Sequence, residues 1–96
     1  MNNLRTVIID DVKKARASLI YLLEKYCKGI TIVGVAQDAE SGKVLIEREK
    51  PDIVFLDIEM PGGSGFDLLK SLDYKGFALI FVTAYNEYAI QAFKSN

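Results

Sequence analysis

The chain has 96 residues, and its 12 lysines and arginines against 13 aspartates and glutamates give a net charge of −1. This size fits one globular domain, and scattered basic residues argue against a nucleic-acid-binding surface in this chain. The chain has no histidine, which excludes Ser-His-Asp catalysis and imidazole-based zinc sites. It shows no bilayer-spanning run and no signal-peptide pattern, so we expect a cytoplasmic protein that does not contact a membrane.

The N-terminal part predicts a strand followed by a helix. Residues 6–9 form a short, uninterrupted apolar and β-branched run that stops at Asp10, as expected for a strand buried on both faces. Apolar residues then recur at alternating steps of three and four, which predicts an amphipathic helix. We expect its buried stripe to consist of Val12, Ala15, Leu19, Leu22 and Tyr26. Gly29 is the expected stop of this helix.

The middle of the chain predicts a second strand, a second helix and a third strand. Residues 30–36 are rich in β-branched side chains, which favours a strand. Asp38 is expected to open a helix that ends before Pro51. Residues 53–56 form a third buried run, which ends at a carboxylate, Asp57.

The last third predicts a loop, a third helix, a fourth strand and a fourth helix. Residues 60–65 contain a proline and three glycines, so we expect them to form a loop without regular structure. Ser64 and Asp67 give a capping-box pattern that opens a short third helix. Residues 78–82 predict a fourth buried strand, and Asn86 can cap a fourth helix.

The element order is therefore strand then helix, four times over. Buried strands that alternate with helices are typical of an α/β fold with a doubly wound parallel sheet. Ligands of such sheets bind beyond the carboxyl ends of the strands, where the strand order reverses. Four polar residues lie at predicted strand ends and are the candidate site: Asp10, Asp11, Asp57 and Thr83.

The three aspartates predict a cation site. Carboxylates brought close together repel one another unless a cation lies between them, and an all-oxygen ligand set selects Mg²⁺, or Mn²⁺ in its place. Because Mg²⁺ favours phosphate oxygens as further ligands, we expect phosphoryl chemistry. Each feature alone also has a structural explanation, because an Asp pair after a strand forms turns and single aspartates cap helices.

Three segments carry a resemblance to a known family. Residues 8–11, 57–65 and 83–85 resemble the signature segments of the receiver domain of two-component response regulators. Residues 81–93 are similar in particular to receivers that precede a LytTR-type DNA-binding domain. The resemblance implies a flavodoxin-like fold, a receiver domain over residues 1–96, and a signalling module rather than an enzyme with turnover.

The resemblance also implies a role for each site residue. Asp57 would be the phosphoacceptor, which takes a phosphoryl group from a sensor histidine kinase. Asp11 and Asp57 would ligate Mg²⁺ directly together with the backbone carbonyl of Glu59, and Asp10 would act largely through a bound water. Thr83 would hydrogen-bond the new phosphoryl group.

The chain also departs from the family pattern. Receivers continue into a fifth strand that carries a lysine and into a fifth helix, so the resemblance implies that this chain is truncated at its C-terminal side. We expect the apolar strand over residues 78–82 to lie at a sheet edge and to promote self-association.

Two other functions stay open. One is an Asp-nucleophile phosphohydrolase of the haloacid-dehalogenase kind. Those enzymes carry a second Asp two residues after the nucleophile, where this chain has Glu59, and a downstream acidic pair that this chain lacks. The other is a degenerate receiver that acts as a protein interaction module.

Overall fold

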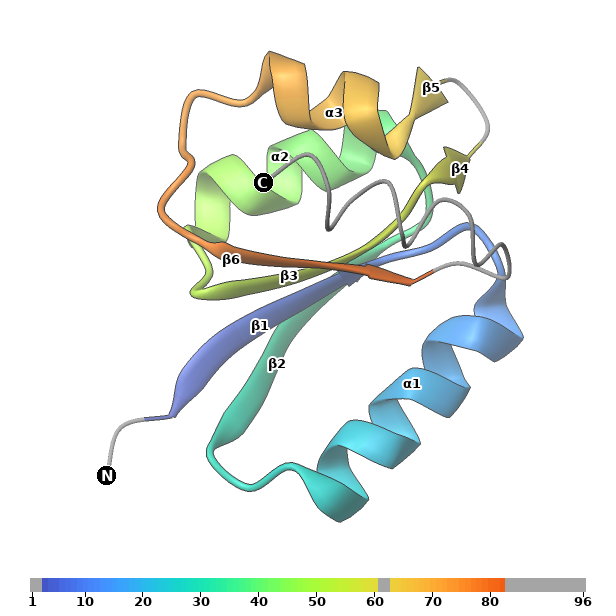
Figure 1. Cartoon of the computed structure of the whole chain (residues 1–96), viewed down its shortest axis with the longest axis vertical. Coiled ribbons are helices and arrows are strands. Elements are labelled where there is room, and N and C mark those ends of the chain that lie inside the picture. Colours follow the sequence, from blue (N-terminus) through green and yellow to red (C-terminus); the bar gives the residue numbers. More distant parts are fainter. Residues whose placement is uncertain (1–2, 61–62, 83–96) are drawn as a thin grey trace.

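The computed structural model describes residues 3–60 and 63–82. Figure 1 shows the elements, which in chain order are β1 (Leu4–Ile9), α1 (Lys13–Tyr26), β2 (Ile30–Ala36), α2 (Ala39–Glu49), β3 (Ile53–Asp57), β4 (Glu59–Met60), β5 (Gly63–Ser64), α3 (Gly65–Ser71) and β6 (Ala78–Val82). Two features expected from the sequence, the polar residue Thr83 and the helix after Asn86, lie outside the described residues.

The main sheet confirms the doubly wound α/β prediction. Its strand order is β2-β1-β3-β6, and neighbouring strands are parallel. α1 covers one face of the sheet, and α2 and α3 cover the other (Figure 1). The chain moves outward from β1 to β2 and then returns past β1 to β3, so the strand order reverses between β1 and β3. This is the position at which parallel sheets of this kind bind ligands.

The central strand β1 is buried on both faces, as its unbroken apolar run predicted. Val7 and Ile9 face the side of α2 and α3, where they join a cluster that includes Ile46 and Leu68. Ile8 faces the opposite side and packs with residues of α1 and β3, Leu23 and Phe55. Each of the three β1 side chains is at most 1% exposed. Burial on both faces fixes the strand, and with it the place where the chain leaves the sheet.

The buried face of α1 differs from the predicted stripe. Leu23 is buried, and Leu19 and Ile20 pack against the same cluster. Three members of the predicted stripe are exposed instead: Val12, Leu22 and Tyr26. Leu19 was thus predicted correctly. The three exposed residues were misplaced because apolar residues occupy two adjacent strips of this helix, and spacing alone does not say which strip meets the sheet. The helix also ends before the expected glycine. Its last residue is Tyr26, and Gly29, with φ of +86°, lies in the turn that leads into β2.

The glycine-rich segment after β3 is more regular than predicted. β4 and β5 form a two-residue antiparallel pair, in which Glu59 lies opposite Ser64 and Met60 opposite Gly63. Gly65 then begins α3, and its N–H donates to the carbonyl of Ile58 at 2.6 Å. Such a pair needs only backbone hydrogen bonds, so a glycine-rich sequence can form it. The expectation of an entirely irregular loop was therefore wrong.

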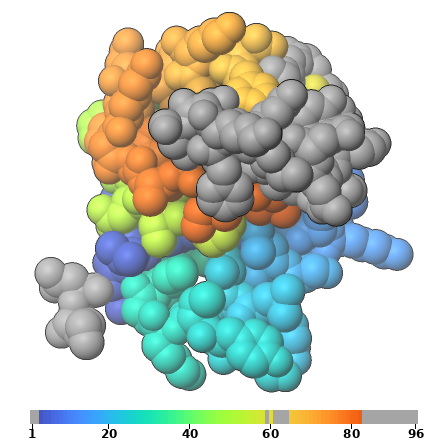
Figure 2. Space-filling model, viewed as in Figure 1, coloured from blue at the N-terminus to red at the C-terminus, as the bar shows by residue number. Residues whose placement is uncertain are grey.

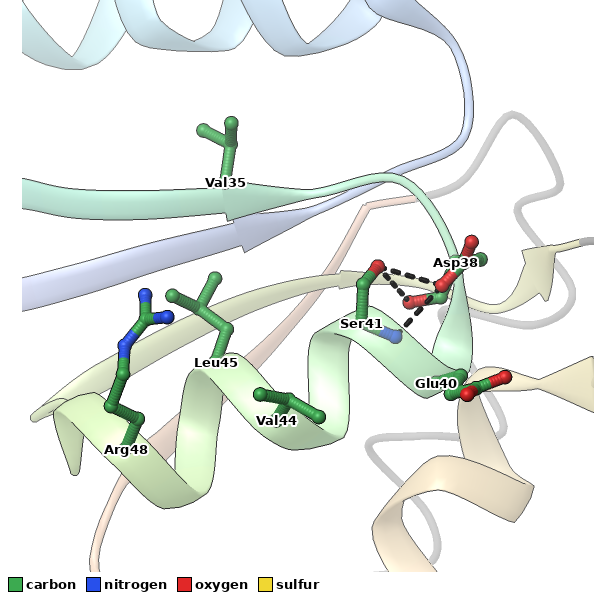
Figure 3. Close-up of a pocket in the computed structure, with 7 residues that line it drawn as sticks. All are labelled: Val35, Asp38, Glu40, Ser41, Val44, Leu45 and Arg48. Carbon is green, nitrogen blue, oxygen red and sulfur yellow. Dashed lines mark hydrogen bonds between the residues drawn. The ribbon is translucent and has the colours of Figure 1, made fainter.

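The start of α2 agrees with the sequence. Asp38 is its N-cap, and its Oδ1 accepts hydrogen bonds from the Ser41 backbone N–H at 2.8 Å and from the Ser41 hydroxyl at 2.6 Å (Figure 3). These two bonds lower the pKa of Asp38, with the hydroxyl as the larger cause. The helix ends at Glu49, followed by Lys50 in the left-handed conformation and then Pro51.

Within residues 3–60 and 63–82, β6 lies at the edge of the sheet with β3 as its strand neighbour. The orange atoms of β6 reach the surface at the level of the sheet in Figure 2. Ile80 on this strand is 44% exposed. None of the helices in these two stretches is both long and apolar enough to cross a bilayer.

Candidate metal centre

Strand register places two of the aspartates side by side. Ile9, the last residue of β1, lies opposite Leu56 of β3. Asp10 and Asp57 each follow one of these two partners in the chain, so they reach the carboxyl edge of the sheet together. Asp11 comes next, where the chain turns away from the sheet toward α1. The site therefore lies at the β1 to β3 reversal point, as the sequence predicted.

The three carboxylates form one cluster. Asp10, Asp11 and Asp57 can each offer one oxygen such that all three oxygens lie within 4.8 Å of one another. Asp10 is only 7% exposed, Asp57 is half-buried and Asp11 is exposed. Two negative charges at this separation repel by about 3 kcal/mol at an effective dielectric constant near 20. A divalent cation that prefers oxygen ligands, such as Mg²⁺, fits this donor set and would relieve the repulsion.

Asp10 is held firmly by neighbouring groups. Its backbone N–H donates to the carbonyl of Ala36 at the end of β2, at 3.0 Å. One oxygen of its side chain accepts from the N–H of Val12 at 2.9 Å. A carboxylate has about four lone-pair positions, so this bond leaves capacity for a cation or a water. The carbonyl of Asp10 accepts from the guanidinium of Arg16 at 2.7 Å. The sequence prediction missed Arg16, because one arginine on an amphipathic helix gives no distinct signal.

Gly65 shapes the site from behind Asp57. A Cβ at this position would lie 2.7 Å from the backbone oxygen of Asp57 and 3.2 Å from the Cα of Ile58. Contacts below 3.0 Å essentially never occur for real Cβ atoms, and both of these neighbours are backbone atoms. The start of α3 can approach the end of β3 this closely because residue 65 has no side chain. The sequence left two interpretations of this glycine open: it could shape the loop that approaches the site, or it could belong to an ordinary turn.

Two other residues that the sequence predicted for the site, Thr83 and Glu59, were expected to contribute a hydroxyl and a backbone carbonyl rather than a carboxylate. Thr83 lies outside the described residues, although Val82, which precedes it, lies opposite Asp57 in the register of β6 and β3. Glu59 lies two residues after Asp57, in β4, where it pairs with Ser64. The backbone of Glu59 is thus part of a regular element next to the cluster.

A separate hollow is lined by other residues than the three clustered aspartates. It measures about 420 Å³ and is lined by residues of β2, α2 and the turn between them, which Figure 3 shows as sticks: Val35, Asp38, Glu40, Ser41, Val44, Leu45 and Arg48. None of the three clustered aspartates is among these residues. The candidate site is therefore a cluster at the sheet edge that is distinct from this hollow.

A parallel sheet with helices on both faces and an acidic cluster at its reversal point defines a doubly wound α/β protein with a candidate ligand site at its strand ends. The family model of the response regulator receiver domain matches residues 6–96, so the chain belongs to the receiver domains of response regulators, the phosphorelay modules of two-component signalling. This membership confirms the resemblance seen in the signature segments. It favours the receiver interpretation over the phosphohydrolase alternative.

Curated relatives support the same family. An uncharacterized response regulatory protein of Vibrio cholerae is 45% identical over 94 residues, which cover 97% of this chain and 39% of the relative. The sensory transduction protein LytT of Bacillus anthracis is 40% identical over 94 residues, which cover 95% of this chain and 37% of that protein. The similarity to LytT agrees with the predicted likeness to LytTR-type receivers. This chain spans less than two fifths of the length of either relative.

Solved structures share the fold. The response regulator domain of Thermotoga maritima CheB has a TM-score of 0.83 and 26% identity, and the match covers 97% of this chain and 72% of that one. A DNA-binding response regulator of the LuxR family from Staphylococcus aureus has a TM-score of 0.79 and 26% identity, over 97% of this chain and 80% of that one. The flavodoxin-like receiver fold predicted from the sequence is therefore confirmed.

Proposed function

We propose that this receiver accepts a phosphoryl group on Asp57 in a reaction that requires Mg²⁺. The convergence of three carboxylate oxygens within 4.8 Å at the reversal point of the sheet carries this proposal. In the reaction, an oxygen of the Asp57 carboxylate attacks phosphorus and an O–P bond forms. The N–P bond of a phosphohistidine breaks, and its electron pair stays on the departing imidazole nitrogen, which takes up a proton from solvent. The product is an acyl phosphate.

The residues of the cluster divide this work by position. Asp57 is half-buried at the end of β3, which is paired on both sides by β1 and β6, so its backbone is held in place at the edge of the sheet. Asp11 and Asp57 would hold the cation directly, with the carbonyl of Glu59, and the more buried Asp10 would act largely through a water. When bound, Mg²⁺ supplies positive charge that offsets the charge on the transferring phosphoryl oxygens. Thr83 would hydrogen-bond the phosphoryl group after transfer.

We infer that the phosphoryl donor is a sensor histidine kinase. The 96 residues contain no histidine, so the phosphohistidine has to lie outside them. Membership of the response regulator receiver family supports a kinase as the protein that carries it. In this scheme the chain is a phosphorylated signalling module that turns over no free substrate.

Direct measurement of cation binding tests the site. Mn²⁺, followed by electron paramagnetic resonance of the free ion, is expected to bind the wild-type chain and to bind Asp11→Asn and Asp57→Asn at least about 10-fold more weakly, because each variant loses one charged ligand. Glu40→Gln is the matched control, because Glu40 is an exposed acid in the first turn of α2. Equal weakening by all three substitutions would show a general charge effect and would refute a defined site.

A further inference from the structure

Arg16 is attached to the acidic turn by both its backbone and its side chain. Its N–H donates to the carbonyl of Val12 at 3.1 Å, and its guanidinium donates to the carbonyl of Asp10 at 2.7 Å. Val12 in turn donates its N–H to the carboxylate of Asp10 at 2.9 Å. These three bonds form a closed ring through Asp10, Val12 and Arg16. The ring encloses the turn that carries Asp11 away from the sheet.

Arg16 lies where residues of α1, β2 and α2 line one hollow. α1 begins beside the carboxyl end of β1 (Figure 1). From the first turns of this helix, half-buried Arg16 reaches a hollow of about 250 Å³ that it shares with Ala36 and Gln37 at the end of β2 and with Ser41 of α2. Ala36 also accepts the N–H of Asp10. The peptide groups of Asp10 are thus fixed from one side by β2 and from the other by Arg16.

We propose that Arg16 is a positioning residue for the metal centre: its charged hydrogen bond to the Asp10 carbonyl sets the orientation of the turn and so of the carboxylates of Asp10 and Asp11. The inference rests on the proposed cation site and adds a residue to it. Hydrogen bonds from a charged donor are about twice as strong as neutral ones. Groups that orient metal ligands from behind typically contribute 10- to 100-fold to metal affinity.

Two explanations of Arg16, one by its charge and one by its positioning role, predict opposite changes in cation affinity when the residue is removed. If Arg16 acts only through its positive charge, it repels a divalent cation, and its removal strengthens cation binding. If Arg16 orients the ligands, its removal weakens binding despite the lost repulsion. Lys14 is the matched control, because it is an exposed cation on the same helix, two residues away.

The experiment compares Mn²⁺ affinity of wild type, Arg16→Ala, Arg16→Lys and Lys14→Ala at one ionic strength, at a temperature where each variant is folded. We expect about 10-fold weaker binding for Arg16→Ala, an intermediate value for Arg16→Lys, which keeps a charged donor, and unchanged or slightly tighter binding for Lys14→Ala. Unchanged or tighter binding by Arg16→Ala overturns the proposal. If Arg16→Ala does not fold, Arg16→Gln takes its place under the same criterion.

A second readout separates this proposal from the cation site itself. The Val12 amide is hydrogen-bonded to Asp10 inside the ring, so its hydrogen exchange reports the order of the turn without any metal. We expect several-fold faster exchange at Val12 in Arg16→Ala and wild-type exchange in Lys14→Ala. Unchanged exchange in Arg16→Ala refutes the positioning role. Failure of the wild-type chain to bind Mn²⁺, with faster Val12 exchange in the variant, would instead refute the cation site and leave the role of Arg16 in the turn supported.

Discussion

Replacing Gly65 with alanine tests whether the start of α3 sets the position of Asp57. The new Cβ would lie 2.7 Å from the Asp57 backbone oxygen, about 0.7 Å inside ordinary van der Waals contact, which begins near 3.4 Å. Backbone neighbours cannot rotate away, so β3 and α3 have to separate. Forced overpacking of this kind costs about 1–3 kcal/mol, out of a total stability of roughly 5–14 kcal/mol for a chain of this length.

The expected result has two parts. The midpoint of thermal unfolding should fall by about 4–8 °C for each kcal/mol lost. Mn²⁺ affinity should fall by about 10-fold, because the shift moves the backbone that carries the Asp57 carboxylate. Thermal unfolding followed by circular dichroism gives the first value, and titration of the folded variant with Mn²⁺ gives the second.

Gly34→Ala is the matched control. Its Cβ would lie equally close to a neighbour, 2.6 Å from Leu45 Cδ1, but this atom is the far end of a flexible side chain. Moving Leu45 off its rotamer costs roughly 0.5–1.5 kcal/mol, and Gly34 lies on β2, away from Asp57. We expect Mn²⁺ affinity to be unchanged in this variant. Equal affinity in wild type and Gly65→Ala, or equal losses in both glycine variants, would refute the reasoning.

Two further predictions concern acid stability and association. The Glu47 carboxylate accepts from the backbone N–H groups of Asp73 at 2.7 Å and Tyr74 at 3.0 Å. These bonds lower the pKa of Glu47 below 4.5, and the bond from Asp73 is the largest cause. The charge of Lys50 lowers this pKa further. A carboxyl group whose pKa is lowered by folding stabilises the fold at pH values above its pKa in the unfolded state. This stabilisation is lost as the pH falls through the pKa of the group in the folded state. Urea unfolding should therefore show Glu47→Gln less stable than wild type near neutral pH, with the difference shrinking below about pH 4.5; a pH-independent difference would contradict this. Ile80→Lys should reduce concentration-dependent self-association of the chain in sedimentation, because a charge blunts the exposed β6 edge. A wild-type chain that stays monomeric at all concentrations would contradict the expected edge pairing.

The sequence predicted the sheet better than its helices and loops. Runs rich in β-branched and apolar residues marked β2 and β6 with the bounds that the structure has. The expectation that residues 78–82 form a buried strand was wrong, because β6 has β3 as its strand neighbour on one side and Ala78 and Ile80 are exposed. The face of α1 was wrong, because its second apolar strip, with Leu22 and Tyr26, was equally compatible with the spacing. The β4 and β5 pair was missed, because its hydrogen bonds involve backbone groups that side-chain patterns do not report.

The three aspartates of the acidic cluster could be predicted from the sequence, but the contacts that Arg16 and Gly65 make with their backbone could not. Asp10, Asp11 and Asp57 each end or follow a strand, and parallel order brings such ends to one edge. Arg16 and Gly65 act through a backbone carbonyl and through the absence of a side chain. Contacts of this kind depend on how α1 and α3 pack on the sheet, which local sequence does not encode.

The most direct test of the central claim is phosphorylation of Asp57 by a small N–P donor, phosphoramidate, followed by intact-mass and peptide mass spectrometry. With Mg²⁺ present, we expect the wild-type chain to gain one phosphoryl group on the peptide that contains Asp57, and we expect no gain in Asp57→Asn or after removal of divalent cations. Equal phosphorylation of Asp57→Asn, or of wild type without a divalent cation, would contradict the account. A wild-type chain that binds Mn²⁺ but is never phosphorylated would contradict it as well, and would favour a degenerate receiver that acts as an interaction module.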